Sequence, residues 1–313
     1  MRSTPLVACS LLSFLLVAAP VVAQTPRDAL LVSPSWVAAH MHDANTILLH
    51  VGDPKNYPAK HLAGARLIQM ADVSVSDHSG MQMPAGLPPE PLTGPKNGLL
   101  LEMPTADQLR SQFSKFGISD NTKIIIYSAD EWISPTTRVV FTLDYAGLGW
   151  QSSLLDGGMQ QWIAAGQPVT KAISASRTGS LAPLRINPIV VDAAWVGSHL
   201  HSPKIAIVDG RASSFYDGIE ATGDRKGHIP GARSVPFTEI ADDKNFIRSP
   251  DQLKALFARA GIAPDDTIVG YCHIGQQATA MLFAARLVGH PVKLYDGSMQ
   301  EWSRRTDLPV ALR

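Results

Sequence analysis

The sequence contains little cysteine and little charge. Its 313 residues include only two cysteines, Cys9 and Cys272, and 17% are charged, with a formal net charge of zero. No cluster of Lys and Arg provides the positive field that holds a polyanion, so the sequence argues against a nucleic-acid partner. Apolar residues are abundant instead: 45% of the chain is hydrophobic, which is typical of globular domains, and the length is sufficient for two of them.

Residues 1–23 have the pattern of a cleaved secretory signal. Arg2 precedes an apolar segment from Leu6 to Val17, and small residues ending at Ala23 form a cleavage pattern. An uncleaved anchor is the alternative, but the apolar segment is shorter than the roughly 20 residues that a membrane span needs. We therefore expect an exported, periplasmic protein with no stable membrane anchor after signal cleavage.

Removal of this signal leaves Cys272 as the single thiol, so no internal disulfide can form. Thr267–Tyr271 is predicted to be a buried strand and Gln276–Leu287 a helix, which places Cys272 at a strand-to-helix turn. Unpaired backbone N–H groups and the positive end of a helix dipole stabilise a thiolate there. A buried structural cysteine is the alternative, because free cysteines are among the most buried residues.

The chain repeats itself over a long period. Four segments of the first half recur in the same order in the second half: Trp36–His42 as Trp195–His201, His61–Arg66 as His228–Arg233, Asp107–Ile118 as Asp251–Ile262, and Leu155–Trp162 as Tyr295–Trp302. A period of this length indicates two duplicated domains and not a solenoid of short repeats. Each copy alternates short apolar strands with amphipathic helices, which predicts an α/β domain with a mainly parallel sheet.

We expect four parts in the chain. They are the signal at 1–23, a first domain at 24–169, a linker at 170–188 rich in Ser, Gly and Pro, and a second domain at 189–313. The first copy carries an insertion at 71–100, whose Pro- and Gly-rich part is predicted to be a surface loop of unassigned role. The second copy carries extra residues near 218–226.

The duplicated chain resembles a two-domain rhodanese, a family of sulfurtransferases. His228–Ala232 matches the early signature of the family and Tyr295–Trp302 its C-terminal one. The chain departs from the family at Met159, Met299 and Ala63, all expected to be packing positions. The resemblance implies two tandem rhodanese-like domains, each a mainly parallel five-stranded sheet flanked by helices. It also implies a catalytic second domain, with Cys272 as the nucleophile that carries sulfur as a persulfide, and no metal or organic cofactor.

The residues after Cys272 are the candidates for binding a sulfur donor. Backbone N–H groups of the turn would stabilise first the thiolate and then the persulfide, and we assign this role to His273, Ile274, Gly275, Gln276 and Gln277. We expect the His273 side chain to be solvated. The resemblance implies that Arg211, just after a strand, contacts the anionic donor. The alternative is that Arg211 pairs with a carboxylate such as Asp209 or Asp217.

The first copy lacks these groups. Alignment of Ile124–Tyr127 with Ile268–Tyr271 sets Ser128 opposite Cys272, and alignment of Gly52 with Gly210 sets Asp53 opposite Arg211. The loop after Ser128 is longer and acidic, so it would repel an anion. We expect a catalytically silent first domain that closes the site.

Other functions fit the sequence less well than sulfur transfer does. A cysteine phosphatase or arsenate reductase needs an arginine six residues after the cysteine, where this chain has Ala278. A rhodanese-like module that carries sulfur without catalysis remains an alternative. So does a metal site at His40 and His42, at His199 and His201, or at the Met-containing insertion, although histidines two apart on a helix face different directions.

The donor is left open by the loop sequence. Thiosulfate is favoured because of the exported setting and the glutamines, and 3-mercaptopyruvate is the alternative. The acceptor would be cyanide or a thiol.

Overall fold

The computed structural model describes residues 26–79, 91–129, 132–175 and 177–312. The expected signal lies outside the described residues, as do residues 80–90 of the first-copy insertion and the acidic pair 130–131. Among the described residues, no helix combines the length and the apolar character needed to cross a membrane.

The first domain is built around a parallel sheet of five strands. In spatial order they are β1 (Leu31–Val32), β5 (Ser152–Leu155), β4 (Lys123–Ser128), β2 (Thr46–Val51) and β3 (Arg66–Ile68). All neighbouring strands pair in parallel. The central strand β4 is an almost continuous run of apolar residues because both faces of the sheet are covered by helices.

Among the described residues of this domain, seven helices accompany the sheet. They are α1 (Pro26–Leu30), α2 (Pro34–His40), η1 (Met70–Asp72), α3 (Ala106–Lys115), α4 (Ser134–Tyr145), η2 (Gly149–Gln151) and α5 (Gly158–Ala164). Thr105 caps α3 through a reciprocal pair of hydrogen bonds with Gln108, and Ser249 and Gln252 do the same for the equivalent helix of the second domain.

The second domain repeats this topology. Its sheet has the order β10 (Arg233–Ser234), β7 (Ile205–Asp209), β11 (Thr267–Tyr271), β12 (Val292–Tyr295) and β6 (Val190–Val191), all parallel. Its helices are α6 (Ala193–Ser198), α7 (Ser213–Tyr216), η3 (Phe237–Ile240), α8 (Pro250–Arg259), α9 (Gln277–Leu287) and α10 (Ser298–Trp302). The α/β fold with two five-stranded parallel sheets is therefore confirmed.

The extra residues of the second copy form a hairpin. Strands β8 (Ala221–Thr222) and β9 (Arg225–Lys226) pair antiparallel with each other outside the main sheet. The segment at 170–188 is coil where it is described, and it lies on the first domain: His61 pairs with Thr170, and Arg110 Nε donates to the carbonyl of Leu181 at 2.7 Å.

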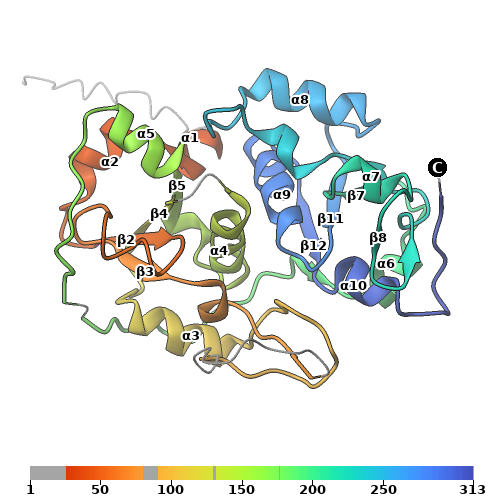
Figure 1. The fold of residues 1–313 in the computed structure, drawn as a ribbon, viewed down its shortest axis with the longest axis horizontal. Coiled ribbons are helices and arrows are strands. Elements are labelled where there is room, and N and C mark those ends of the chain that lie inside the picture. Colours follow the sequence, from red (N-terminus) through yellow and green to blue (C-terminus); the bar gives the residue numbers. More distant parts are fainter. Residues whose placement is uncertain (1–25, 80–90, 130–131, 176, 313) are drawn as a thin grey trace, which may run out of the picture.

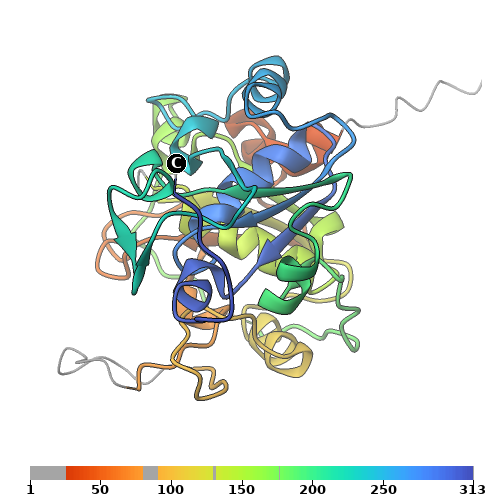
Figure 2. The ribbon, with the colours of Figure 1, turned by 90° about the vertical axis from the view of Figure 1, so that its right-hand side faces the viewer.

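The two domains meet along α4 and α9, which lie side by side between the sheets (Figures 1 and 2). A single buried apolar cluster continues across this contact. Asp296 and Asp156 occupy equivalent positions in the two domains, and each accepts a backbone hydrogen bond from the other domain. Met103 N–H donates to Asp296 Oδ2 at 2.6 Å, and Ile247 N–H donates to Asp156 Oδ1 at 3.0 Å. The interface thus has an approximate two-fold symmetry that follows from the duplication.

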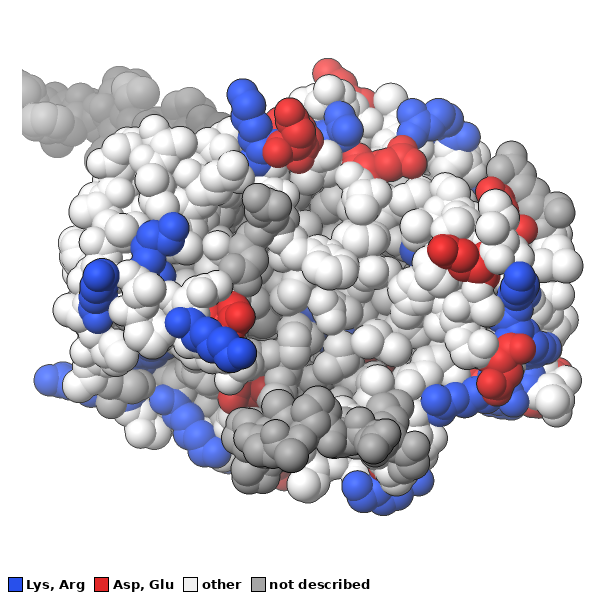
Figure 3. All heavy atoms as spheres, viewed as in Figure 1, with Lys and Arg blue, Asp and Glu red and all other residues white. Residues whose placement is uncertain are grey.

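Charged side chains of both signs are scattered around the periphery of the face in Figure 3. This distribution agrees with the net charge of zero and with the absence of a basic cluster from the sequence.

Candidate functional site

Cys272 directly follows β11, the central strand of the second sheet, at its carboxyl end. Its backbone is held by α10, because its N–H donates to Ser298 Oγ at 3.1 Å and its carbonyl accepts from Met299 N–H at 3.0 Å. The side chain has no exposed area. A donor must therefore displace neighbouring side chains to reach the sulfur.

The active loop, defined as residues 272–277, runs from this cysteine to the first residue of α9. Gly275 has a φ of +79°, in the left-handed region that favours glycine. Within the described part of the chain, the backbone N–H groups of residues 273–276 have no hydrogen-bond acceptor. Successive free N–H groups of this kind form an anion-binding nest, as a thiolate or a persulfide requires.

Arg211 is fully buried and paired with Asp209. Its Nη2 donates to Asp209 Oδ2 at 2.6 Å and to the carbonyl of Gly227 at 2.8 Å, while its Nε donates to Asp209 Oδ1 at 3.0 Å. Burial disfavours the charged form, but the hydrogen bond and the charge of Asp209 outweigh it and raise the pKa of Arg211. The structure thus shows the carboxylate pairing that the sequence left open, and direct contact between Arg211 and a donor stays a prediction.

The hairpin of the second copy reaches the active loop. Arg211 Nη1 donates to Thr222 Oγ1 at 3.2 Å, and the same hydroxyl is hydrogen-bonded to His273 Nδ1. The ring of Phe215 packs edge-on against His273, with 4.5 Å between ring centroids. Burial, followed by the charge of Arg211, lowers the pKa of His273 to about 4. His273 is half-buried and thus less solvated than expected, because the inserted hairpin and Phe215 contact its ring.

The glutamines of the active loop face different surroundings. Gln276 Nε2 donates to Ser134 Oγ of the first domain at 3.2 Å, so this side chain fixes the loop to α4. Gln277 begins α9 and has a buried side-chain oxygen without a described partner. Ile274 is half-buried. The assignment of residues 273–277 to donor binding stays a prediction, with the backbone N–H groups as its strongest part.

The equivalent place in the first domain holds Ser128. Tyr127 precedes it and accepts a hydrogen bond from Leu62 N–H, just as Tyr271 accepts one from Ile229 N–H. Ser128 therefore occupies the position of Cys272.

The strand pairing corrects the alignment around Arg211. Tyr127 lies opposite His50, whereas Tyr271 lies opposite Asp209, so His50 takes the place of Asp209 and Gly52 that of Arg211. Asp53 is one residue further along. The alignment by glycines failed because the pairing of strands, and not a shared glycine, sets their register. Burial and the nearby His61 lower the pKa of His50 to about 4. The first domain therefore has a neutral histidine ring in the position that the Asp209 carboxylate occupies in the second.

Arg138, on α4, is a candidate that the sequence did not single out. It is fully buried, and its Nη1 donates to the carbonyl of Gly275 at 2.9 Å and to Asp296 Oδ1 at 2.7 Å. An arginine directly before the apolar run Val139–Phe141 of the helix is a signal that could have found it, because buried charges are retained only when they are paired.

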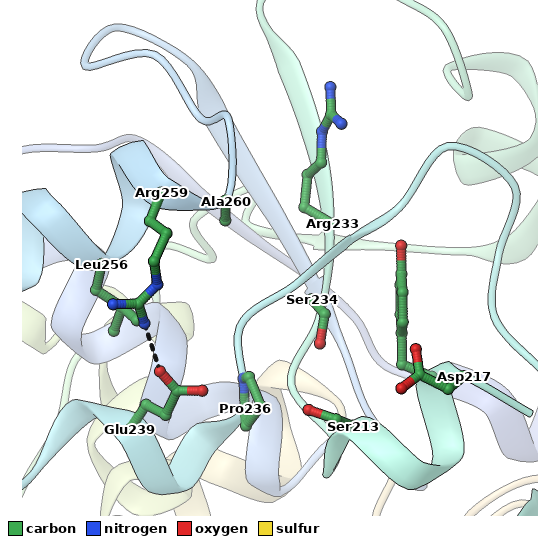
Figure 4. Close-up of a pocket in the computed structure, with 10 residues that line it drawn as sticks. Ser213, Asp217, Arg233, Ser234, Pro236, Glu239, Leu256, Arg259 and Ala260 are labelled. Carbon is green, nitrogen blue, oxygen red and sulfur yellow. Dashed lines mark hydrogen bonds and ion pairs between the residues drawn. The ribbon is translucent and has the colours of Figure 1, made fainter. Parts of the chain in front are cut away.

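A polar pocket of about 340 Å³ lies at the β10 edge of the second sheet (Figure 4). It is lined by Ser213, Tyr216, Asp217, Arg233, Ser234, Pro236, Glu239, Leu256, Arg259 and Ala260. At its rim Arg259 pairs with Glu239 at 2.7 Å. The pocket contains no residue of the active loop, so the candidate site is defined by the chemistry around Cys272 and not by this cavity.

Two of the four histidines that the sequence offers as metal ligands, His40 and His199, contact a tryptophan of their own helix. His40 stacks on Trp36 and His199 on Trp195, with ring centroids 4.1 and 3.9 Å apart. Each also hydrogen-bonds the carbonyl of its tryptophan at 2.8 Å. These histidines stabilise the C-terminal ends of α2 and α6.

Both halves of the chain match one protein family, and similar proteins over most of its length carry sulfurtransferase names. The family described as rhodanese-like domain matches residues 33–165 and again residues 192–305. A putative thiosulfate sulfurtransferase from Synechococcus elongatus is 28% identical over 93% of this chain and 88% of its own length. A probable 3-mercaptopyruvate sulfurtransferase from Pseudomonas aeruginosa is 32% identical over 67% of this chain and 74% of its own. The crystal structure of YnjE has a TM-score of 0.74 at 25% identity and covers 92% of this chain and 69% of its own.

Proposed function

The chain belongs to the rhodanese family, and we propose that it is a sulfurtransferase that moves a sulfane sulfur through a persulfide on Cys272. The observation that carries this proposal is the active loop. Among the described residues its N–H groups at 273–276 have no acceptor, and they directly follow Cys272, the one thiol that remains after removal of the expected signal. Relatives similar over most of the chain carry sulfurtransferase names, which supports an enzyme over a module that only holds sulfur.

The donor that we favour is thiosulfate. The Cys272 thiolate attacks the outer sulfur, a new Sγ–S bond forms, the S–S bond of thiosulfate breaks, and sulfite leaves with the bonding electrons. The negative charge moves to the persulfide, which the N–H groups of the active loop stabilise. Cyanide or a thiolate then attacks the outer sulfur, takes it as thiocyanate or as a new persulfide, and restores the Cys272 thiolate.

The relative from Pseudomonas aeruginosa supports 3-mercaptopyruvate as the alternative donor. In that reaction the C–S bond breaks, the enolate of pyruvate leaves, and the thiol proton passes to its carbon. Measurement of kcat/KM with both donors on one preparation distinguishes the two, because a preference for one transition state appears directly in that ratio.

The first domain is silent in this proposal. Ser128 replaces the thiol, and the place of Arg211 is taken by Gly52. We expect Cys272→Ser to abolish thiocyanate formation and Ser128→Ala to leave kcat/KM nearly unchanged. Mass spectrometry after exposure to thiosulfate should show one added sulfur on Cys272. A large loss of activity in the Ser128 variant, or wild-type protein without added sulfur, would contradict the proposal.

Export to the periplasm is part of the proposal and rests on residues 1–23. N-terminal sequencing of protein recovered from fractionated cells tests it. The expected result is a periplasmic chain that begins at Gln24, and a cytoplasmic chain that begins at Met1 would contradict it.

A further inference from the structure

Arg138 connects the silent domain to the active loop. It lies on α4, its side chain has no exposed area, and its guanidinium donates to three groups: the carbonyl of Gly275, Asp296 Oδ1 and the carbonyl of Leu101. Hydrogen bonds from a charged donor are roughly twice as strong as neutral ones. A buried charge of the first domain therefore holds the loop that carries the nucleophile of the second.

The bond to Gly275 also sets the direction of the next N–H group. In a planar trans peptide the C=O and the N–H point in opposite directions. With the Gly275 carbonyl held by Arg138, the N–H of Gln276 points away from the guanidinium, and it has no acceptor among the described residues. The orientation of at least one donor of the anion nest thus depends on Arg138.

The loop is packed closely against this ion pair. A Cβ placed on Gly275 would lie 2.8 Å from the carbonyl oxygen of Asp296 and 3.0 Å from Arg138 Nη1. Rotation of the Gly275 peptide would break the hydrogen bond that its carbonyl accepts from Arg138 Nη1, the same nitrogen that binds Asp296 Oδ1. The pair fixes the backbone of the loop, in addition to joining the domains.

Arg27 offers a matched comparison on the opposite side of the interface. Its Nη1 donates to the carbonyl of Arg248 at 3.2 Å and its Nη2 to the carbonyl of Ile247 at 3.3 Å. Like Arg138, it comes from the first domain and binds backbone carbonyls of the second. It has no contact with the active loop, so it isolates the effect of joining the domains.

We propose that Arg138 is a positioning residue for sulfur transfer, which orients the N–H groups of the active loop around Cys272 by holding the Gly275 carbonyl. This inference rests on the proposed function, since it assigns to the first domain a part in forming the persulfide. It also gives a reason for the retention of a domain that lacks a nucleophile.

The test uses the mature chain with Arg138→Met, Arg138→Lys and Arg27→Met. Thermal unfolding establishes that each variant is folded. Two further readouts are the rate of persulfide formation with thiosulfate, followed by mass spectrometry, and the pH dependence of Cys272 alkylation by iodoacetamide. We expect Arg138→Met to slow persulfide formation about tenfold to a hundredfold, as loss of a charged hydrogen bond predicts. We also expect the pH midpoint of alkylation to rise by about one unit, because misaligned N–H groups stabilise the thiolate less.

Arg138→Lys should recover part of both effects, because an ammonium group can still donate to the Gly275 carbonyl. Arg27→Met should lower the unfolding temperature without moving the pH midpoint. An unchanged midpoint in folded Arg138→Met, or an equal shift in Arg27→Met, would overturn the inference. If Arg138→Met fails to fold, Arg138→Lys provides the test. The inference is then overturned if Arg138→Lys has the same pH midpoint of alkylation and the same rate of persulfide formation as wild type.

Failure of the proposed function has a separate signature. In that case the wild-type protein itself acquires no sulfur on Cys272. When wild-type protein forms the persulfide and the Arg138 variants form it at the same rate and with the same alkylation midpoint, only the positioning role is excluded.

Discussion

At the scale of single residues, the ion pair of Arg211 and Asp209 stands out because both side chains are fully buried. Removing one partner of such a pair leaves an uncompensated charge in the interior. We expect Arg211→Met to lower the free energy of unfolding by about 3–5 kcal/mol. Chemical denaturation measures this, and the double variant with Asp209→Asn should lose clearly less than the sum of the single losses. Simple additivity would show that the two side chains act independently.

His273 provides a second prediction at this scale. Its pKa is lowered to about 4, first by burial and then by Arg211, so the folded state binds the proton more weakly than the unfolded state, whose histidine titrates near 6.5. Its contribution to stability is therefore complete above pH 6.5 and is lost as the pH falls towards 4. An NMR titration should find the ring neutral at pH 6, and a midpoint near 6.5 would contradict the burial that the structure shows.

The residue scale is also where prediction from sequence was least complete. The place of Cys272 directly after a strand could be predicted from the local pattern of apolar residues alone. The sequence leaves open whether Arg211 contacts the donor or a carboxylate, and it gives no local pattern that places Arg138 at the active loop. Both depend on contacts between segments far apart in the chain, which hydrophobic periodicity does not encode.

At the scale of elements, the segment before α3 brings Glu102 next to the Arg138–Asp296 pair. Burial first, and then the charges of Asp296 and Glu301, raise the pKa of Glu102 from 4.5 to about 7, while Arg138 acts in the opposite direction. One of its carboxylate oxygens is buried without a described partner. The folded state thus retains the proton that the unfolded state releases near pH 4.5.

This environment predicts a pH dependence with a definite sign. A carboxyl group with a raised pKa favours folding at low pH, and this contribution is lost as the pH rises from 4.5 to about 7, at about 1.4 kcal/mol for each pH unit. Glu102→Gln should therefore be more stable than wild type at pH 8 and similar to it below pH 4.5. Unfolding curves in urea at both pH values test this, and a variant less stable at pH 8 would refute it.

The position of the inserted hairpin β8–β9 was predicted from the spacing of the repeats, but its contacts were not. Thr222 links Arg211 with His273, which gives the second copy a structure around its active loop that the first copy lacks. Sequence spacing shows that residues have been added. It does not show which way a hairpin folds, because that depends on the surface against which the hairpin packs.

At the scale of the whole molecule, the approximate two-fold axis between the domains makes Asp156 and Asp296 equivalent in position. Each accepts a backbone hydrogen bond from the other domain, but Asp296 also binds Arg138. Asp156→Ala should lower the free energy of unfolding by about 1–3 kcal/mol, the cost of an unsatisfied buried donor, with little change in kcat/KM. Asp296→Ala should lower both quantities.

Denaturation and steady-state assays on the two aspartate variants provide the measurement. The comparison is matched, because the two residues occupy the same position of the repeated motif. Equal losses of kcat/KM in both variants would indicate that activity depends on contact between the domains in general and not on the Arg138–Asp296 pair.

The amino-acid sequence by itself determined the duplication, the α/β class and the parallel sheets, and it predicts Cys272 as the nucleophile. These follow from local composition, from periodicity and from the order of motifs along the chain. Only the tertiary structure decided that Arg211 is paired with Asp209, that a hairpin contacts His273, and that an arginine of the first domain binds the active loop. The physical reason is that hydrogen bonds and ion pairs across α4 and α9 depend on distances in space, which are set when the two sheets pack together.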